Sequence, residues 1–201
     1  MRRRSDLVRR FNSLLNRLSA RRRKEIEPLL EWLKRDGEFF RAPASTSKEH
    51  HLPYPGGLLE HSINVAEYML RLRDILAPDI PDDSVIIVGL FHDLGKIGSP
   101  GAPLYLPNPD KKERKEKPYI HNPSLVRMGV PIRSLSILSR FVTLSEEETQ
   151  AICYHDGQYV PENEIVAHHE RPLTLLVHFA DIWCATIVEK EAKTKQTKNS
   201  G

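Results

Sequence analysis

A histidine and an aspartate stand side by side in an apolar run, residues 84–96, which reads SVIIVGLFHDLGK. The spacing of the apolar residues predicts a buried helix, so His92 and Asp93 are expected to leave water on folding. Burying an ionised carboxylate is costly unless a cation pairs with it. Imidazole nitrogen and carboxylate oxygen together suit metals such as Zn, Fe, Co and Mn. If the pair binds a metal, other residues must supply the missing ligands.

Two further polar residues fall on helix faces that the apolar periodicity assigns to the core. His61 follows Leu58 by three positions and precedes Val65 by four, and Asp181 lies four positions after Val177. A single histidine on such a face is usually an ordinary core residue. Two imidazoles and two carboxylates from three helices are better explained by a metal in the core of a helical bundle, because two uncompensated buried aspartates would destabilise the fold.

These residues form an ordered motif of three short segments, LLEHS, HDLGK and HFAD. The motif resembles the H…HD…D pattern of the HD-domain metal-dependent phosphohydrolases, and the resemblance spans roughly residues 38–190. It implies a catalytic Asp93 that helps to hold the attacking water, and a catalytic or substrate-binding Lys96 that contacts phosphate or that water. Without the motif, Lys96 is equally well explained as a surface lysine near a helix end. The resemblance implies that the first metal is ligated by His61, His92, Asp93 and Asp181.

Members of this family with two metals supply further histidines between the HD pair and the last aspartate. His121 and His155 occupy that interval here, and the resemblance implies that they bind a second ion bridged by Asp93. Some relatives have two adjacent histidines where this chain has His155-Asp156, so Asp156 either ligates the metal or orients His155. The alternative for each histidine is a loop-end residue without a role. The expected cofactor is one or two divalent transition metal ions (Mn, Fe, Co, Ni or Zn).

The remaining histidines carry weaker signals. His51, beside His50, is expected to line the mouth of the site and to bind substrate. His178, one turn before Asp181, either supports the site or is a core residue. The HHE sequence at 168–170 looks like the start of an HD-GYP motif, but the rest of that motif does not follow.

One local resemblance is closer. Residues 39–62 are similar to the HD module of YhaM-type 3′–5′ exoribonucleases and to small stand-alone HD hydrolases, including phage-borne ones. The exoribonuclease carries an N-terminal OB-fold domain, for which this chain leaves no room. The resemblance therefore supports the module and leaves an RNA substrate open.

The composition indicates a soluble globular protein with one sizeable core. The chain has 201 residues, of which 39% are hydrophobic and 28% charged. It shows no apolar run long enough for a membrane span and no secretory signal, so no membrane partner is expected. The only cysteines, Cys153 and Cys184, disfavour disulfides and cysteine-based zinc sites and fit a cytoplasmic location.

The net charge of +3 is unevenly distributed. Residues 1–24 hold nine Arg and one Lys against one acid, so this segment could contact a polyanion. A solvated amphipathic helix is the favoured interpretation. Its single apolar face is formed by Leu7, Phe11, Leu14, Leu15 and Leu18.

The predicted fold class is all-α, an HD-domain helical bundle with an N-terminal helical extension. Residues 1–37 are expected to form basic helices that pack on or extend from the core, 38–190 the HD domain, and 191–201 a disordered tail. Pro28 is placed in the first turn of the second helix and Gly37 at its end. Residues 98–120 are expected to form a lid or a disordered segment. No strand is expected.

The leading functional hypothesis is a phosphohydrolase that acts on a nucleotide or short nucleic acid through a metal-activated water. Within it, a 3′–5′ exoribonuclease is the second substrate class. A non-catalytic nucleic-acid-binding or regulatory HD module is the alternative, motivated by the basic N-terminus. A structural helical domain with satisfied core histidines is the third. The sequence does not determine the oligomeric state.

Overall fold

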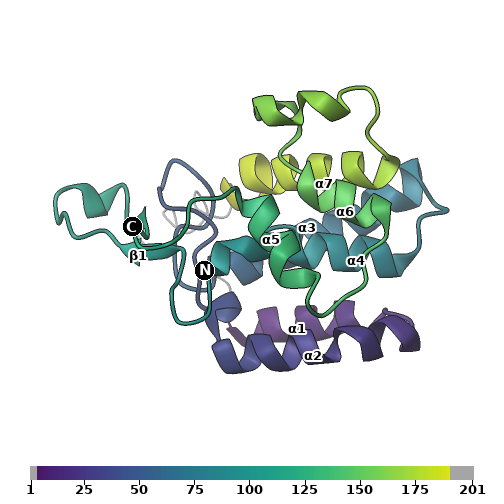
Figure 1. Ribbon diagram of the computed structural model, residues 1–201, viewed down its shortest axis with the longest axis horizontal. Helices are drawn as coiled ribbons and strands as arrows, with labels where there is room; N and C mark the ends of the chain where they lie inside the picture. Colours follow the sequence, from purple (N-terminus) through teal and green to yellow (C-terminus); the bar gives the residue numbers. More distant parts are fainter. Residues whose placement is uncertain (1–3, 191–201) are drawn as a thin grey trace, which may run out of the picture.

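The computed structural model describes residues 4–190, which are mostly helical (Figure 1). The all-α prediction is confirmed, apart from one two-stranded antiparallel sheet. Its strands have three residues each, too few for an alternating pattern to show in the sequence. The α-helices and strands are α1 (Arg4–Asn16), α2 (Ala20–Asp36), α3 (Gly57–Leu76), α4 (Asp82–Phe91), β1 (Tyr105–Pro107), β2 (Tyr119–His121), α5 (Val130–Leu138), α6 (Glu146–Cys153) and α7 (Pro172–Trp183). The short 3₁₀ segments are η1 (Glu38–Phe40), η2 (Leu94–Ile97), η3 (Glu113–Lys115), η4 (Gly157–Tyr159) and η5 (Pro161–Val166), and η6 (Cys184–Val188) is a π-helical turn.

Helices α3 and α4 form the centre of the bundle (Figure 1). They cross closely at Gly89, where a Cβ atom would lie only 2.6 Å from the Cα of Ala66. A glycine is needed at this position because the backbone of α3 occupies the space of a side chain. The close crossing brings His61 on α3 near His92 at the end of α4, with their ring centroids 5.5 Å apart.

The HD pair lies just beyond a helix and not inside one, which corrects the sequence prediction. Helix α4 ends at Phe91, His92 is its C-cap, and Asp93 begins the tight turn of η2. The turn packs against α5, because a Cβ at Gly95 would lie 2.3 Å from the carbonyl oxygen of Val130. The sharp change of direction frees the two side chains from the spacing of a continuous helix.

The start of α4 is not capped by a side chain, and Pro81 is its N-cap. The carboxylate of Asp83 instead accepts hydrogen bonds from the backbone N–H and the hydroxyl of Ser19, at 2.7 and 2.6 Å. Asp83 therefore ties the start of α4 to the start of α2.

Helix α2 is longer than expected. It begins at Ala20, with Ser19 as its N-cap, so Pro28 lies in its interior and not in its first turn. Pro28 is on the exposed face, where water can satisfy the carbonyl that loses its partner. The end of the helix was predicted correctly: Gly37 has φ 76° and donates to the carbonyl of Leu33 at 2.8 Å.

The two N-terminal helices pack against the bundle and share its core. The predicted apolar face of α1 is buried through Leu7, Phe11 and Leu14, in one cluster with α3 and α4. Several arginines of the basic segment are engaged inside the molecule. Arg10 bonds the carboxylate of Glu67 at 2.7 Å, so part of the positive charge serves to attach α1.

A buried ion pair attaches α2. The guanidinium of Arg22 contacts both carboxylate oxygens of Glu148, at 2.8 and 2.9 Å, and both residues are buried. Glu148 also completes the predicted capping box with Ser145 and accepts from the hydroxyl of Ser84. One carboxylate thus links α2, α4 and α6.

Two sequence predictions concern other segments. Residues 98–120, expected as a lid or as disordered, form an ordered hairpin of β1 and β2 that projects from the bundle (Figure 1). The predicted disordered tail, 191–201, lies outside the described residues. Within residues 4–190, no helix is long and apolar enough to cross a membrane.

We expect Glu148→Ala to lower the free energy of unfolding by about 3–5 kcal/mol, because it removes the buried two-oxygen partner of Arg22 and leaves this buried charge only its contact with the partly exposed Glu25. The matched control is Glu147→Ala on the same helical turn, whose exposed pair with Arg171 should contribute only about 0–1 kcal/mol. Denaturant unfolding measures both values. Equal effects would show that the buried pair does not attach α2.

Candidate metal centre

Three imidazoles from different elements meet in the core. His61 comes from the second turn of α3, His92 from the end of α4, and His155 from the segment after α6. Their exposed fractions are 0%, 0% and 2%, and the ring centroids of His92 and His155 lie 4.8 Å apart. Such a cluster needs a nearby negative charge or a bound cation in place of the protons, because neighbouring imidazoles that are all positively charged repel each other.

The rings are oriented by their other nitrogen atoms. Nδ1 of His92 lies 3.0 Å from the carbonyl of Gly89, and Nδ1 of His155 lies 2.9 Å from the carbonyl of Ile152. A carbonyl oxygen can only accept, so Nδ1 carries the proton in both rings and Nε2 remains available as a ligand. Nε2 of His92 is buried without a hydrogen-bond partner, and Nε2 of His61 faces a carboxylate oxygen of Asp181 at 3.0 Å. The orphaned nitrogen atom of His92 fits a metal ligand, since buried polar groups otherwise find partners.

Asp93 lies between the imidazoles. Its Oδ2 atom is 3.6 Å from Nε2 of His61 and also from Nε2 of His92, while its Oδ1 atom is 3.6 Å from Nε2 of His155. The two carboxylate oxygens therefore face different histidines, as a bridge between two ions requires. Lys96 places its Nζ atom 2.5 Å from Oδ2 of the same carboxylate.

Asp181 completes the predicted first set of ligands from α7. Its Oδ1 atom is 3.0 Å from Nε2 of His61. Possible ligand atoms lie within 4.8 Å of one another in overlapping groups of three. These groups are His61, His92 and Asp181; His92, Asp93 and His155; His155, Asp156 and Asp181; and His51, His61 and Glu189.

The structure does not bring His121 to this cluster, contrary to the sequence-based expectation. His121 is exposed and lies in β2, with its ring 5.2 Å from that of Tyr105 in β1. Pairing within the hairpin fixes it there. Asp156 is closer to the second position, with Oδ1 at 3.8 Å from Nε2 of His155, which favours ligation among the two roles considered for it.

His51 lies deeper than the mouth of the site. Its ring centroid is 4.4 Å from that of His61, with the two rings tilted by 32°, and its Nε2 atom is buried without a partner. Burial, followed by the nearby His61 and Lys96, lowers the pKa of His51 to about 3. A neutral imidazole is therefore available beside the ligands, whereas the neighbouring His50 is exposed.

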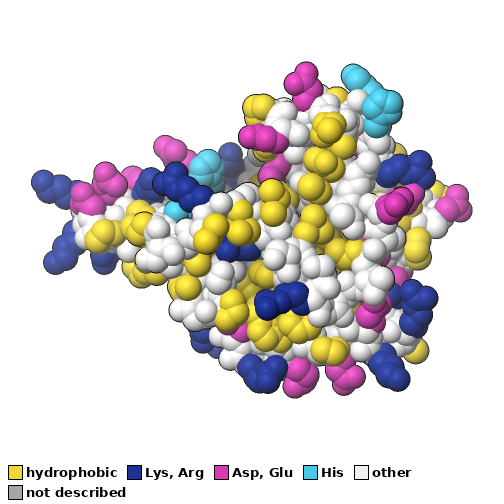
Figure 2. Space-filling model, viewed as in Figure 1, with side chains coloured by type: hydrophobic (Ala, Val, Ile, Leu, Met, Phe, Trp, Pro, Cys, Tyr) yellow, Lys and Arg dark blue, Asp and Glu magenta, His cyan; other side chains and the backbone are white. Residues whose placement is uncertain are grey.

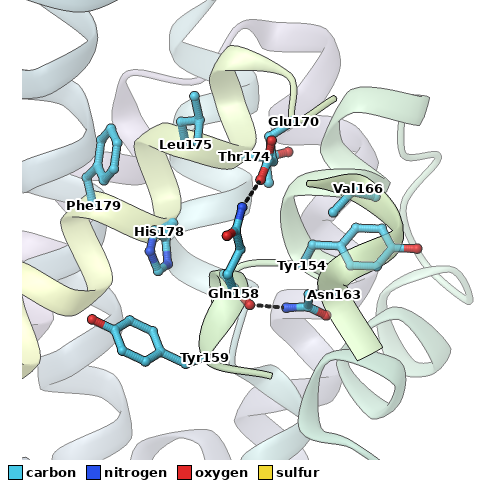
Figure 3. Close-up of a pocket in the computed structure, with 11 residues that line it drawn as sticks. Tyr154, Gln158, Tyr159, Asn163, Val166, Glu170, Thr174, Leu175, His178 and Phe179 are labelled. Carbon is cyan, nitrogen blue, oxygen red and sulfur yellow. Dashed lines mark hydrogen bonds between the residues drawn. The ribbon is translucent and has the colours of Figure 1, made fainter. Parts of the chain in front are cut away.

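His178 supports the cluster from behind. Its Nδ1 atom lies 2.9 Å from the carbonyl of His155. Its ring occupies space that only a glycine leaves free, because a Cβ at Gly157 would lie 2.3 Å from it. Figure 3 shows His178 on the wall of a cavity between α7 and the η4–η5 segment, with Tyr159 and Phe179 nearby. His178 thus fixes the loop that carries two candidate ligands.

A protein-family model described as "HD domain" matches residues 58–188. The chain belongs to the HD-domain family. The match runs from the first turn of α3 to the π-helical turn after α7, so it includes all four residues of the H…HD…D motif and excludes α1 and α2. Comparison with curated proteins and with solved structures gave no match.

One residue of the cluster around Asp93, called the HD centre below, was not predicted from the sequence and lies just beyond the family match. Glu189 is 1% exposed, and its carboxylate is 3.1 Å from Nδ1 of His61 and accepts from Asn64 at 2.9 Å. On a regular α-helix, Glu189 would lie roughly 80° around the axis from Asp181. The wider π turn, closed by the N–H of Glu189 on the carbonyl of Cys184, reduces that offset. Sequence periodicity does not indicate a π turn.

Burial and neighbouring carboxylates set the charges of the HD centre in the metal-free protein. Burial lowers the pKa of His61, but Glu189 and Asp181 outweigh it and raise the pKa to about 10. Burial likewise lowers the pKa of His155, and Asp93 outweighs it to give about 9. For His92, burial dominates and lowers the pKa to about 4. Two of the three imidazoles are therefore cations at neutral pH.

The carboxylates respond in the opposite direction. Burial raises the pKa of Asp93, but Lys96 and then His92 outweigh it and hold the pKa well below its usual range. Burial raises the pKa of Asp181 too, and its hydrogen bond to His61 outweighs it and lowers the pKa. Without metal, protons on imidazoles and the Lys96 ammonium balance the ionised carboxylates, and a bound metal would replace those protons.

Glu189→Gln should weaken metal binding by about 10–100-fold, because the carboxylate that orients His61 and raises its basicity is lost. Metal titration followed by calorimetry measures the change. Glu162→Gln, at an exposed carboxylate, is the control and should bind metal like the unaltered protein. Unchanged affinity in Glu189→Gln would show that Glu189 only fills space.

The stability of the chelated protein should fall as the pH rises from 7 to 10. The pKa values of His61 and His155 are raised above the unfolded value of about 6.5, so their protonated forms stabilise the metal-free fold. That contribution is complete below about pH 6.5 and is lost as the pH passes about 9 and 10. Thermal unfolding with and without added Ni²⁺ tests this, and the metal-loaded protein should show a smaller decline. Parallel declines would contradict the expectation.

Proposed function

We propose that this HD domain is a metal-dependent phosphohydrolase that acts on a nucleotide or a short nucleic acid. The observation that carries the proposal is that the buried Nε2 atoms of His61, His92 and His155 all lie 3.6 Å from the Asp93 carboxylate, and that Nε2 of His92 has no hydrogen-bond partner. A structural domain with satisfied core histidines would pair that atom. Donor atoms that converge on one position are what a metal centre requires.

The donor set suits one or two divalent transition metals. His61, His92, Asp93 and Asp181 would hold the first ion, and His155 with Asp156 and the second oxygen of Asp93 would hold another. Mixed imidazole and carboxylate donors fit Mn, Fe, Co, Ni or Zn better than Mg or Ca. A metal bound there would polarise a phosphoryl oxygen and lower the pKa of a bound water toward neutrality.

Lys96 and His51 supply further groups at the same place. The Lys96 ammonium is held by Asp93 and would stabilise negative charge as it develops on the phosphoryl oxygens. Neutral His51 would donate or accept a hydrogen bond through its unpartnered Nε2. Both side chains reach the cluster from segments outside α7, so the substrate would be contacted from more than one side.

The surface supports an anionic substrate. Figure 2 shows Lys and Arg side chains on the projecting hairpin. Residues 110–117, DKKERKEK, contain five basic and three acidic residues, so this exposed arm has a formal charge of +2. A positively charged arm of this kind would attract phosphate-bearing molecules to the protein.

Asp93→Ala should abolish release of phosphate or cleavage of a phosphodiester by protein supplied with Mn²⁺, Co²⁺ or Ni²⁺, because both candidate ion positions lose a ligand. Lys96→Met should lower kcat by on the order of 10²–10³-fold while metal stays bound. The screen contains nucleoside monophosphates, cyclic nucleotides and short RNA, and stepwise loss of 3′ nucleotides would identify an exoribonuclease.

The control is Asp79→Asn, which removes an exposed carboxylate from the α3–α4 connection and should leave activity unchanged. Activity that survives Asp93→Ala would contradict the proposal. Salt-sensitive binding of single-stranded RNA without turnover under any metal would favour a non-catalytic nucleic-acid-binding module instead.

A further inference from the structure

A buried guanidinium lacks an acidic partner close to the metal centre. Arg133, in the first turn of α5, is 5% exposed. It donates to the hydroxyl of Ser99 at 3.2 Å and to the carbonyl of Val126 at 2.7 Å, and its Nε atom has no partner. Among residues 4–190, no carboxylate oxygen lies within 4.0 Å of it. A guanidinium has five N–H groups, so most of its donors are not used.

This arrangement is unusual for the molecule. Arg22 is buried to a similar degree and is held by two oxygens of Glu148, and Arg10 is held by Glu67. A guanidinium stays charged at any physiological pH, and a buried charge without a counter-charge is strongly destabilising. The first turn of a helix is also an unfavourable place for a cation, because it carries the positive end of the helix dipole. Arg133 therefore requires an anion that the described residues do not supply.

Arg133 lines a cavity of about 620 Å³ between the hairpin and the start of α5. Arg127 and His121 contribute to the same wall, and none of the nine lining residues is acidic. The N-terminus of α5 adds its partial positive charge. His121, which the sequence suggested as a metal ligand, lines this cavity instead.

The cavity adjoins the segment that carries Lys96. Ser99, which accepts from Arg133, follows Lys96 by three residues. Gly95 packs directly on α5, where a Cβ atom would lie 2.9 Å from Cβ of Arg133. The turn of η2 therefore presents Lys96 toward Asp93 and contacts Arg133 with its backbone.

We propose that the cavity binds a phosphate group, as a second anion site beside the metal centre. The occupant would be the phosphate of the substrate next to the one at the metal centre, as in a dinucleotide with a 5′-phosphate or a nucleoside bisphosphate. This assignment of the substrate rests on the proposed function, whereas the anion site itself does not. Free phosphate has the same chemistry, and the experiment separates the two sources.

The first measurement is thermal unfolding of the full chain in excess chelator, with 10 mM pyrophosphate or phosphate against chloride of equal ionic strength. A ligand that binds only the folded state raises Tm. We expect a rise of several degrees, as for a ligand present at about 100 times its Kd. Arg133→Gln should lose this rise. Lys96→Met should keep it, because the site does not include the metal-centre ammonium.

Arg133 is buried, so Arg133→Gln could fail to fold. Arg127→Gln alters the exposed part of the cavity wall. About tenfold more pyrophosphate should then be needed to give the same rise in Tm. Arg140→Gln, at an exposed arginine just after α5, is the matched control and should leave the effect unchanged. No pyrophosphate-specific rise in the unaltered protein, or equal losses in Arg127→Gln and Arg140→Gln, would overturn the proposal.

The second measurement separates the sources of phosphate. With active enzyme, Arg127→Gln should raise KM by about tenfold for a 5′-phosphorylated dinucleotide and leave KM for a nucleoside monophosphate unchanged, with kcat unchanged for both. A rise in KM for both substrates would overturn the assignment to a neighbouring phosphate. Pyrophosphate stabilisation without hydrolysis of any substrate would refute the proposed function and retain the anion site.

Discussion

The buried carboxylate of Asp93 is the constraint on which the rest of the structure depends. Its oxygens lie 3.6 Å from three imidazole nitrogens and 2.5 Å from an ammonium, so its charge depends on groups from several segments of the chain. Each neighbour comes from a different element, and the close α3–α4 crossing at Gly89 is what brings the first two histidines together. The bundle therefore has to close tightly at this point, because a looser crossing would separate the donors.

The charges of the centre are balanced in either of two ways. Without metal, protons on His61 and His155 and the Lys96 ammonium compensate the carboxylates. A bound metal would take over that charge and the protons would leave, which would link metal binding, protonation and stability. Glu189 and His178 hold the rings and the loop in place through their contacts to Nδ1 of His61 and to the carbonyl of His155.

The surroundings of the centre are fixed by charge as well as by apolar packing. The Arg22–Glu148 pair attaches α2 to helices inside the HD-family match, although α2 itself lies outside it. Arg133 is the contrasting case, a buried cation without a carboxylate among the described residues, facing a cavity that contains no acid. The two arginines show how one residue type can serve stability where its partner is internal, and binding where the partner must come from outside.

The sequence determined the helical class and the apolar faces, and it predicted that His61, His92, Asp93 and Asp181 come together in the core, because these follow from periodicity and from an ordered motif. The candidates for a second ion were only partly predictable: His155 lies in the cluster, but His121 lies in a hairpin whose three-residue strands leave no readable pattern. Only the tertiary structure decided the roles of Glu189, Arg133 and the helix pairing through Glu148. A π turn and long-range ion pairs depend on distances between segments far apart in the chain, and local sequence patterns carry no information about those distances.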